Sequence, residues 1–201
     1  TQGQSNSVLG FSDLSGLYRT NWEYPVIKEI TEAGLMTGET INGEKVFNMN
    51  GKMNRAQVAV LVARYMGYTE DQVIKTEPFE DVGTMEWYSS AVSYLKEKDI
   101  IHGKTPETFA PTDKATRAEF YKMMIKAYIY MHPEVKKEWM ELMGTKIDYF
   151  VDVKEENWFS QYIYLAAHKK LLKGYDLYGT KYALPAQDIT RIEGATIVTN
   201  F

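Results

Sequence analysis

Three arginines occupy the same place in a tetrapeptide that recurs along the chain, and their side chains could bind an anion. The tetrapeptide runs polar residue, Arg, any residue, then Gln or Glu, and it stands at residues 54–57, 116–119 and 190–193. Its first and fourth residues form the pattern of a capping box, in which two side chains satisfy backbone N–H groups at the start of a helix. The pattern therefore predicts three helices that each begin with an arginine: Arg55, Arg117 and Arg191.

The position of these arginines indicates a task other than local stability. The first turn of a helix carries the positive end of the helix dipole, so a cation there is mildly unfavourable. A guanidinium beside free backbone N–H groups can hold a carboxylate or a phosphate through two parallel hydrogen bonds. The alternative is that each arginine pairs with a carboxylate of a neighbouring repeat, with Asp13, Asp81 and Asp152 as candidate partners. The residues alone leave both interpretations open.

Three further residue types recur with the arginines in a fixed order. A Phe-x-Asp-Leu/Val motif comes first, a Trp follows it, and a Gly stands 16 residues after the Trp. Asp before a helix usually accepts backbone N–H bonds, and Trp serves either core packing or stacking on a sugar ring. Gly either ends a helix or admits a ligand to the backbone. The recurring residues are Asp13, Asp81 and Asp152; Trp22, Trp87 and Trp158; and Gly38, Gly103 and Gly174.

The recurrence divides the chain into three repeats of similar length. Each repeat predicts a helix near the Trp, a loop of turns or irregular hairpins, and a second helix from the tetrapeptide. An unrepeated helix is expected at 133–143, so the expected fold class is all-α, with no convincing strand pair. The expected boundaries are a polar segment at 1–10, repeat 1 at 11–70, a connector at 71–78, repeat 2 at 79–131, a connector with the extra helix at 132–149, and repeat 3 at 150–201.

Composition excludes several classes of protein. The 201 residues carry a formal net charge of −4, which argues against a general nucleic-acid binder, and the longest apolar run is far below the about 20 residues of a membrane span. Without cysteine the chain has no disulfide scaffold, cysteine-ligated metal or thiol nucleophile. His102, His132 and His168 are scattered, and hydrolase and phosphate-loop motifs are missing from the sequence. We therefore expect no enzyme, no metal and no cofactor.

The order of motifs resembles the S-layer homology domain, which usually occurs as three tandem copies. Repeat 2 carries the closest match, with F-E-D-V at 79–82, Trp87, I-I-H-G at 100–103 and T-R-A-E at 116–119. The resemblance implies a pseudo-threefold arrangement, in which one helix of each repeat joins a central three-helix bundle and the rest form three prongs.

Repeats 1 and 3 depart from the family pattern. Repeat 1 has Asn54 and Gln57 in the tetrapeptide, and repeat 3 has Ile192 where the pattern has Ala. These departures leave the arginines in place. The last helix stops at Phe201, so we expect repeat 3 to be truncated and a larger protein to continue beyond it.

The resemblance also implies a function. Members of the family bind secondary cell-wall polysaccharide in grooves between the prongs, commonly through a terminal pyruvylated N-acetylmannosamine. By this resemblance, Arg55, Arg117 and Arg191 hold the pyruvyl carboxylate in the three grooves. The recurring Asp residues orient the groove or bind sugar hydroxyls, the Trp residues line its wall, and the Gly residues give access to the backbone.

The implied protein is a non-catalytic module that attaches an S-layer or other surface protein to the cell wall, outside the cell. Its partners are cell-wall polysaccharide and the attached surface-protein domain, without nucleic acid and without membrane insertion. A second hypothesis is a protein–protein module whose helix pairs contact neighbouring subunits in a lattice, without any glycan. A glycan-active enzyme is the third. A solenoid of 34-residue helix pairs is disfavoured, because the recurring motifs do not return at that period.

Overall fold

The computed structural model describes residues 7–71, 77–143 and 149–201. Parts of the expected N-terminal segment and of both connectors, at 1–6, 72–76 and 144–148, lie outside the described residues. The chain divides into two compact units, which are Thr1–Lys52 with Thr190–Asn200, and Met53–Ile189 with Phe201.

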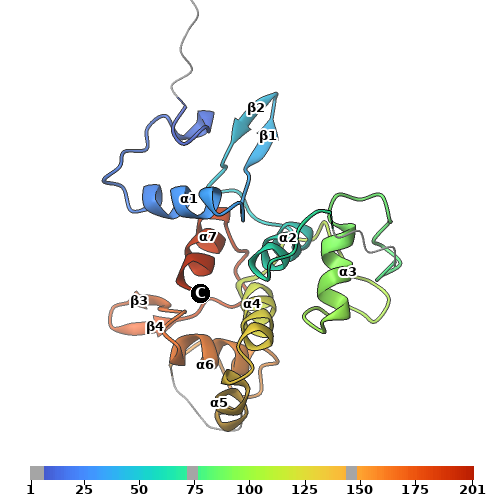
Figure 1. The fold of residues 1–201 in the computed structure, drawn as a ribbon. Helices are drawn as coiled ribbons and strands as arrows, with labels where there is room; N and C mark the ends of the chain where they lie inside the picture. The colour runs from blue at the N-terminus through green and yellow to red at the C-terminus, as the bar shows by residue number, and fades with distance from the viewer. Residues whose placement is uncertain (1–6, 72–76, 144–148) are drawn as a thin grey trace, which may run out of the picture. The chain divides into compact units, whose positions relative to one another are not determined.

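The first unit joins the beginning of the chain to its last helix. A short 3₁₀ turn, η1 (Ser12–Leu14), precedes helix α1 (Glu23–Glu32), and α1 packs against α7 (Arg191–Asn200) (Figure 1). Ile27 and Ile30, three residues apart on one face of α1, are both fully buried. The hairpin β1 (Glu39–Ile41) and β2 (Glu44–Val46) follows α1, and β2 contacts η1.

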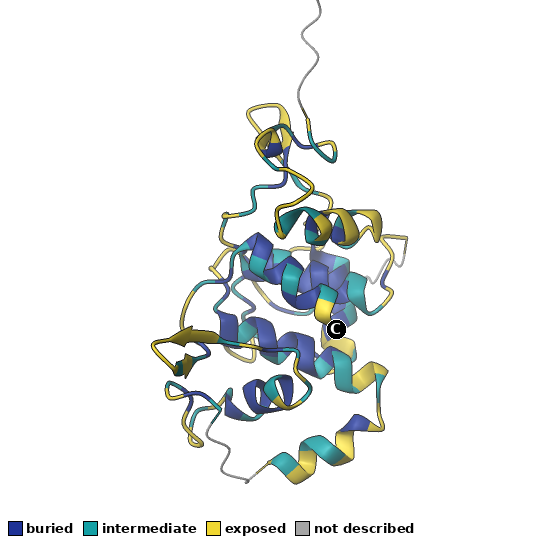
Figure 2. Cartoon of the chain, turned by 90° about the vertical axis from the view of Figure 1, so that its left-hand side faces the viewer, coloured by how far each residue is buried: buried dark blue, intermediate teal, exposed yellow. Residues whose placement is uncertain are grey.

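The second unit is helical around α2 (Arg55–Tyr65) and α4 (Arg117–Met131). Helix α2 packs against α3 (Ser89–Glu97) and α4, and α4 packs against α6 (Ser160–His168). Helices α2 and α4 are buried along most of their length, whereas Val135 is the buried residue of α5 (Val135–Leu142), which packs on α6 (Figure 2). A second hairpin, β3 (Tyr175–Leu177) and β4 (Thr180–Tyr182), belongs to this unit.

The two hairpins contradict the expected fold class. Strands β1 and β2 pair in antiparallel register from Glu39↔Val46 to Ile41↔Glu44, and β3 and β4 pair from Tyr175↔Tyr182 to Leu177↔Thr180. The prediction of an all-α bundle of three repeats with three prongs is therefore wrong. The sequence held a signal for the first hairpin, since Asn42-Gly43 is a preferred two-residue turn and both residues have positive φ.

Repeat 2 lacks such a hairpin because its loop is shorter. Residues 39–46 and 175–182 each have room for two three-residue strands and a two-residue turn. The matching stretch of repeat 2, at 104–108, has only five residues, and it contains Pro106, which has no N–H for a strand ladder. It closes instead through turn bonds from Lys104 and Thr105 N–H to the Thr108 carbonyl.

The predicted helix starts are confirmed. Asn54 with Gln57, and Thr116 with Glu119, form complete capping boxes at the starts of α2 and α4. At α7, Glu193 N–H donates to the Thr190 hydroxyl (3.2 Å) and Thr190 N–H donates to Glu193 (2.8 Å). Helix α5 is the predicted extra helix, two residues after Pro133. The expected repeat boundaries stay a prediction.

Candidate functional site

The three arginines begin α2, α4 and α7, and their backbone N–H groups are already bonded. Arg55 N–H donates to the Asp113 carbonyl (2.9 Å), and Arg117 N–H donates to the Gln187 carbonyl (2.8 Å). Arg191 N–H donates to the Gly51 carbonyl (2.9 Å). The next N–H of each helix also has a carbonyl partner in a loop. An anion near these arginines would therefore meet side chains rather than the open end of a helix.

Each arginine side chain is buried and fixed by the loop of another repeat. Their exposed fractions are 4% for Arg55 and Arg117 and 5% for Arg191. Arg55 Nε donates to the Phe109 carbonyl (2.8 Å), Arg117 Nε to the Ala183 carbonyl (3.0 Å), and Arg191 Nε to the Phe47 carbonyl (2.6 Å). A guanidinium anchored at Nε has its rotation restricted, so its terminal nitrogens point in a set direction.

The recurring aspartates hold the loop residues that these arginines contact. Asp81 accepts from the N–H groups of Phe109 and Ala110, both at 2.7 Å. Asp13 accepts in the same way from residues 47 and 48, and Asp152 from residues 183 and 184. The prediction that these aspartates accept backbone N–H bonds is confirmed, but the prediction of a local turn is wrong. The bond spans about thirty residues instead of a local turn.

This clamp stabilises an unusual backbone conformation. The second residue of each clamped pair has positive φ although it is not glycine: Asn48 (56°), Ala110 (57°) and Leu184 (53°). Such a conformation costs free energy for a residue with a Cβ. The two carboxylate bonds offset the cost, and the preceding carbonyl is thereby directed toward the arginine. The aspartates are positioning residues in this geometry.

The recurring glycines pack against the recurring phenylalanines. A Cβ on Gly38 would lie 2.4 Å from the Phe11 ring, one on Gly103 would lie 2.8 Å from the Phe79 ring, and one on Gly174 would lie 2.4 Å from the Phe150 ring. Backbone carbonyls are as close, for example Thr108 O at 2.3 Å from the Gly103 position. Contact with the Phe ring and the loop backbone thus accounts for glycine here.

A cavity of about 220 Å³ in the second unit brings charged and aromatic groups of several elements together. Arg55 and Glu119 pair across it at 2.9 Å, and Lys122 lies on α4 one turn after Glu119. Lys104 and His102 line the loop side, and the Trp158 ring closes the cavity with Lys122 Nζ 5.3 Å from its centroid. We call this group the Arg55 pocket. It combines three cations with one carboxylate and an aromatic face.

Burial shapes the charges in the Arg55 pocket. It lowers the pKa of Arg55, and Glu119, Asp113 and Asp81 oppose that shift. Burial also lowers the pKa of Lys122, and the neighbouring cations Lys126 and Arg55 add to the shift. A lysine that is poorly solvated gains more from an anionic partner than an exposed one, because the protein has already removed part of its water.

The other two arginines have different neighbours. Arg117 Nη1 reaches the Tyr175 hydroxyl at 3.5 Å, and its guanidinium carbon lies 5.0 Å from the Tyr175 ring centroid. Arg191 Nη1 lies 3.7 Å from a Glu39 carboxylate oxygen, and Asn48 Nδ2 donates to the other Glu39 oxygen at 2.8 Å. Burial lowers the pKa of Arg191, and Glu39 and Asp13 oppose the shift.

The recurring tryptophans are exposed. The exposed fractions are 59% for Trp22, 64% for Trp87 and 53% for Trp158. These side chains are therefore not core residues, and more than half of the surface of each is open to solvent, although Lys122 lies over the Trp158 ring. An exposed indole face is suited to stacking on a sugar ring.

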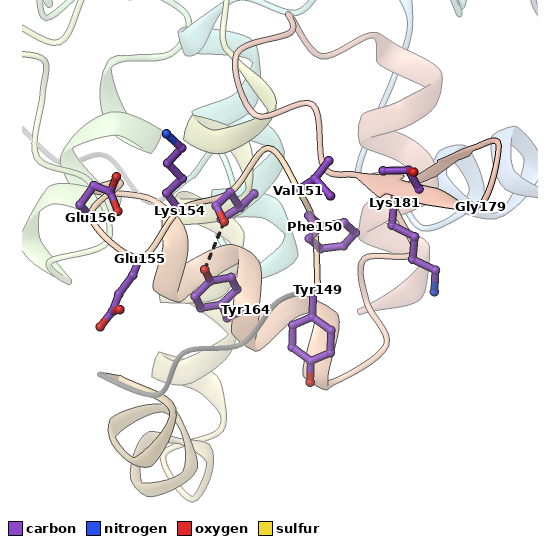
Figure 3. A pocket seen from close by; sticks show the side chains of 11 residues that line it. Tyr149, Phe150, Val151, Lys154, Glu155, Glu156, Tyr164, Gly179 and Lys181 are labelled. Atoms are coloured by element: carbon purple, nitrogen blue, oxygen red, sulfur yellow. Dashed lines mark hydrogen bonds between the residues drawn. The ribbon is translucent and has the colours of Figure 1, made fainter.

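A larger cavity lies in repeat 3, but its polar groups do not converge. It measures about 810 Å³ and lies between Tyr149, Tyr164 and the β3–β4 hairpin. Figure 3 shows Lys154 and Lys181 directing their amines away from one another, and Tyr164 Oη donates to the Val153 carbonyl (3.3 Å). Size alone does not make this cavity the better candidate, since a binding site needs polar groups aimed at one ligand.

Comparison with known proteins finds a family match in the middle of the chain. The model of the S-layer homology domain matches residues 78–120, which hold α3, the Asp81 clamp and the start of α4 with its T-R-A-E motif. This stretch is similar to the S-layer homology domain. The match lies on repeat 2, and whether repeats 1 and 3 are further copies of the domain stays a prediction.

Three curated relatives are similar to this chain. An endoglucanase of Bacillus sp. (strain KSM-635) is 29% identical over 67% of the chain, and the middle cell wall protein of Brevibacillus brevis is 28% identical over 60%. Cell surface glycoprotein 1 of Acetivibrio thermocellus is 26% identical over 49%. The chain spans only 13%, 11% and 4% of these relatives.

Two of these relatives are named for the cell wall or the cell surface. Within the three described stretches, no helix has the length and apolar character needed to cross a membrane. The same stretches contain no group of three potential metal-binding His, Asp or Glu side chains.

Several residues of the arginine surroundings were missed by the sequence reasoning. Lys104, Glu39 and Tyr175 each directly follow a recurring Gly, and Lys122 stands five residues after Arg117. Comparing the repeats at these two positions would have found them. Glu119 was identified as a cap, and its second role as the partner of Arg55 needed the fold.

Proposed function

We propose that this chain anchors a surface protein by binding an acidic cell-wall polysaccharide, and that the Arg55 pocket is a principal contact. The carrying observation is that Arg55, Lys122 and the exposed face of Trp158 line one cavity. A carboxylate-bearing sugar offers a counterion to the cations and an apolar ring face to the indole. The proposal includes pyruvylated N-acetylmannosamine as the terminal sugar, because its pyruvyl group supplies that carboxylate.

The recurring residues have two kinds of role in this proposal. Arg55, Arg117 and Arg191 present nitrogens to a ligand, and Trp22, Trp87 and Trp158 offer exposed ring faces. The aspartates and glycines act without touching the ligand. The aspartates hold the loop carbonyls in place, and the glycines leave room for the Phe rings. Several modest contacts on one polymer raise its overall avidity. The function is binding without turnover, and the anchored domain belongs to a longer surface protein.

Binding to purified wall polymer tests the proposal. Polymer with its pyruvyl groups should retain the protein, and polymer from which they have been chemically removed should retain at least tenfold less, because a charged hydrogen bond is worth about 1.5–3 kcal/mol. Lys122→Met should weaken retention, since it removes a cation of the Arg55 pocket and keeps the buried stem. Lys137→Gln is the matched control, because the Lys137 side chain is 88% exposed.

Equal retention by both polymers would refute the carboxylate contact. Retention of Lys122→Met equal to that of the wild type would refute the Arg55 pocket as a contact. Self-assembly into a lattice with no polymer affinity would favour the protein–protein module instead. Release of reducing sugar ends during the assay would contradict binding without turnover.

A further inference from the structure

The three arginines share one anchoring bond but differ in the charge beside them. Their Nε groups all donate to a loop carbonyl. The residue directly after the recurring Gly then differs, as Glu39, Lys104 and Tyr175. These residues stand beside Arg191, in the Arg55 pocket and beside Arg117, respectively. One position in the sequence thus carries an acidic, a basic and a neutral side chain, and the basic one, Lys104, pairs with Asp113 at 2.5 Å.

A second position adds to the difference. Lys122 stands five residues after the arginine of its helix, where α2 has the buried Val60 and α7 has Thr196. Lys122 lines the Arg55 pocket. Lys122 is therefore a cation at a position where the other two helices carry an uncharged residue.

Arg55 and Arg191 each have a carboxylate of the protein beside them, Glu119 at 2.9 Å and Glu39 at 3.7 Å, but the Arg55 pocket also contains Lys104 and Lys122. The Glu39 carboxylate lies 3.7 Å from Arg191 Nη1 and is held by Asn48 Nδ2 at 2.8 Å. Its side chain is only partly exposed, so solvent screens it incompletely. A ligand carboxylate at Arg191 would approach this fixed negative charge and would be repelled by it.

We propose that the three arginines are not equivalent sites, and that Glu39 and Lys122 decide between them. The Arg55 pocket takes the acidic end of the glycan, and Glu39 weakens the binding of an acidic group at Arg191. The inference rests on the proposed function and adds the specificity-determining residues.

The anchoring bonds provide a direct readout. The chain has five arginines, and the Nε–H groups of Arg55, Arg117 and Arg191 are buried and hydrogen-bonded. Such protons exchange slowly with water, so each arginine should give its own Nε–Hε signal in a ¹H–¹⁵N spectrum. Single Arg→Lys variants assign the signals. The probe is the methyl glycoside of pyruvylated N-acetylmannosamine, with the unpyruvylated sugar as control.

Titration should move the Arg55 signal at the lowest probe concentration and the Arg191 signal last. Glu39→Gln keeps an amide oxygen for Asn48 but removes the charge, so it should let the Arg191 signal respond at least tenfold earlier. Lys122→Met should shift the Arg55 midpoint upward about tenfold, the effect of losing one charged hydrogen bond. The spectrum of each variant shows whether it is folded.

Arg191 responding together with Arg55 in the wild type would overturn the inference, as would a Glu39→Gln variant with an unchanged Arg191 response. Both outcomes would leave the proposed function intact, because the glycan would still bind. Loss of pyruvyl-dependent retention on wall polymer is the separate result that overturns the proposed function. No movement of any arginine signal, with polymer retention intact, would reject the Arg55 assignment.

Discussion

The Arg55 pocket and the Arg191 surroundings are built by the same bonds and differ in what they offer a ligand. In both, a clamped loop residue presents its carbonyl to a buried guanidinium, through Phe109 in one and Phe47 in the other. Lys104 and Lys122 stand near Arg55 together with the Glu119 carboxylate, whereas the Glu39 carboxylate fixed by Asn48 stands near Arg191. The recurring motif thus builds a scaffold, and the residues beside it decide the chemistry. Motif conservation between repeats therefore says little about equal binding.

The largest expected loss of stability comes from removing the buried guanidinium on which both sites are built. Arg55→Met should lower the free energy of unfolding by about 3 kcal/mol, because it leaves the Phe109 carbonyl and the partly buried Glu119 carboxylate without this partner. Arg191→Met should cost less, about 2 kcal/mol, since Glu39 is farther from its arginine and keeps the Asn48 bond. Urea unfolding followed by circular dichroism measures both. Exposed Arg19→Met is the control, and equal losses in the two variants would mean that Glu39 is coupled as tightly as Glu119.

A smaller effect distinguishes the two clamps. Asp81→Asn should lower the free energy of unfolding by about 2 kcal/mol, because one carboxylate acceptor becomes an amide donor and Ala110 must still hold φ at 57°. Asp13→Asn should cost about 1 kcal/mol, because the residue with positive φ there is Asn48, and Asn tolerates this conformation better than Ala. Amide hydrogen exchange at residues 48 and 110 reports each clamp directly. The comparison fails if the Asp13 variant is the less stable one.

The smallest expected effect concerns Lys122, where one substitution should raise the stability of the fold and weaken binding of the polymer. Burial lowers the pKa of this ammonium in the folded state, so folding disfavours its charged form. That cost is present at neutral pH and disappears as pH rises through the lowered pKa toward the ordinary lysine value. Lys122→Met should therefore be slightly more stable than the wild type at pH 7, by about 0.5 kcal/mol, although it binds polymer more weakly. The stability gap should narrow at pH 10, and a gap that widens would contradict the stated cause.

Much of the scaffold could be predicted from sequence because its signals are local. The capping boxes of α2, α4 and α7 need only residues three positions apart, and the structure confirms them. The hairpins were missed although Asn42-Gly43 is a strong turn signal, because three-residue strands carry too little alternation to stand out. The exposure of Trp22, Trp87 and Trp158 was also beyond the sequence, because helical spacing fits either a buried or an open face.

The sequence by itself determined that an arginine begins each of three capped helices, in a fixed order with Asp, Trp and Gly. Only the tertiary structure decided what stands beside each arginine. Its carbonyl partner is 54, 66 or 144 residues away along the chain, and no local pattern connects the two. Charge acts through space, so Lys104 and Lys122 leave the Arg55 pocket with more cations than its Glu119 carboxylate offsets, whereas the Arg191 guanidinium faces Glu39.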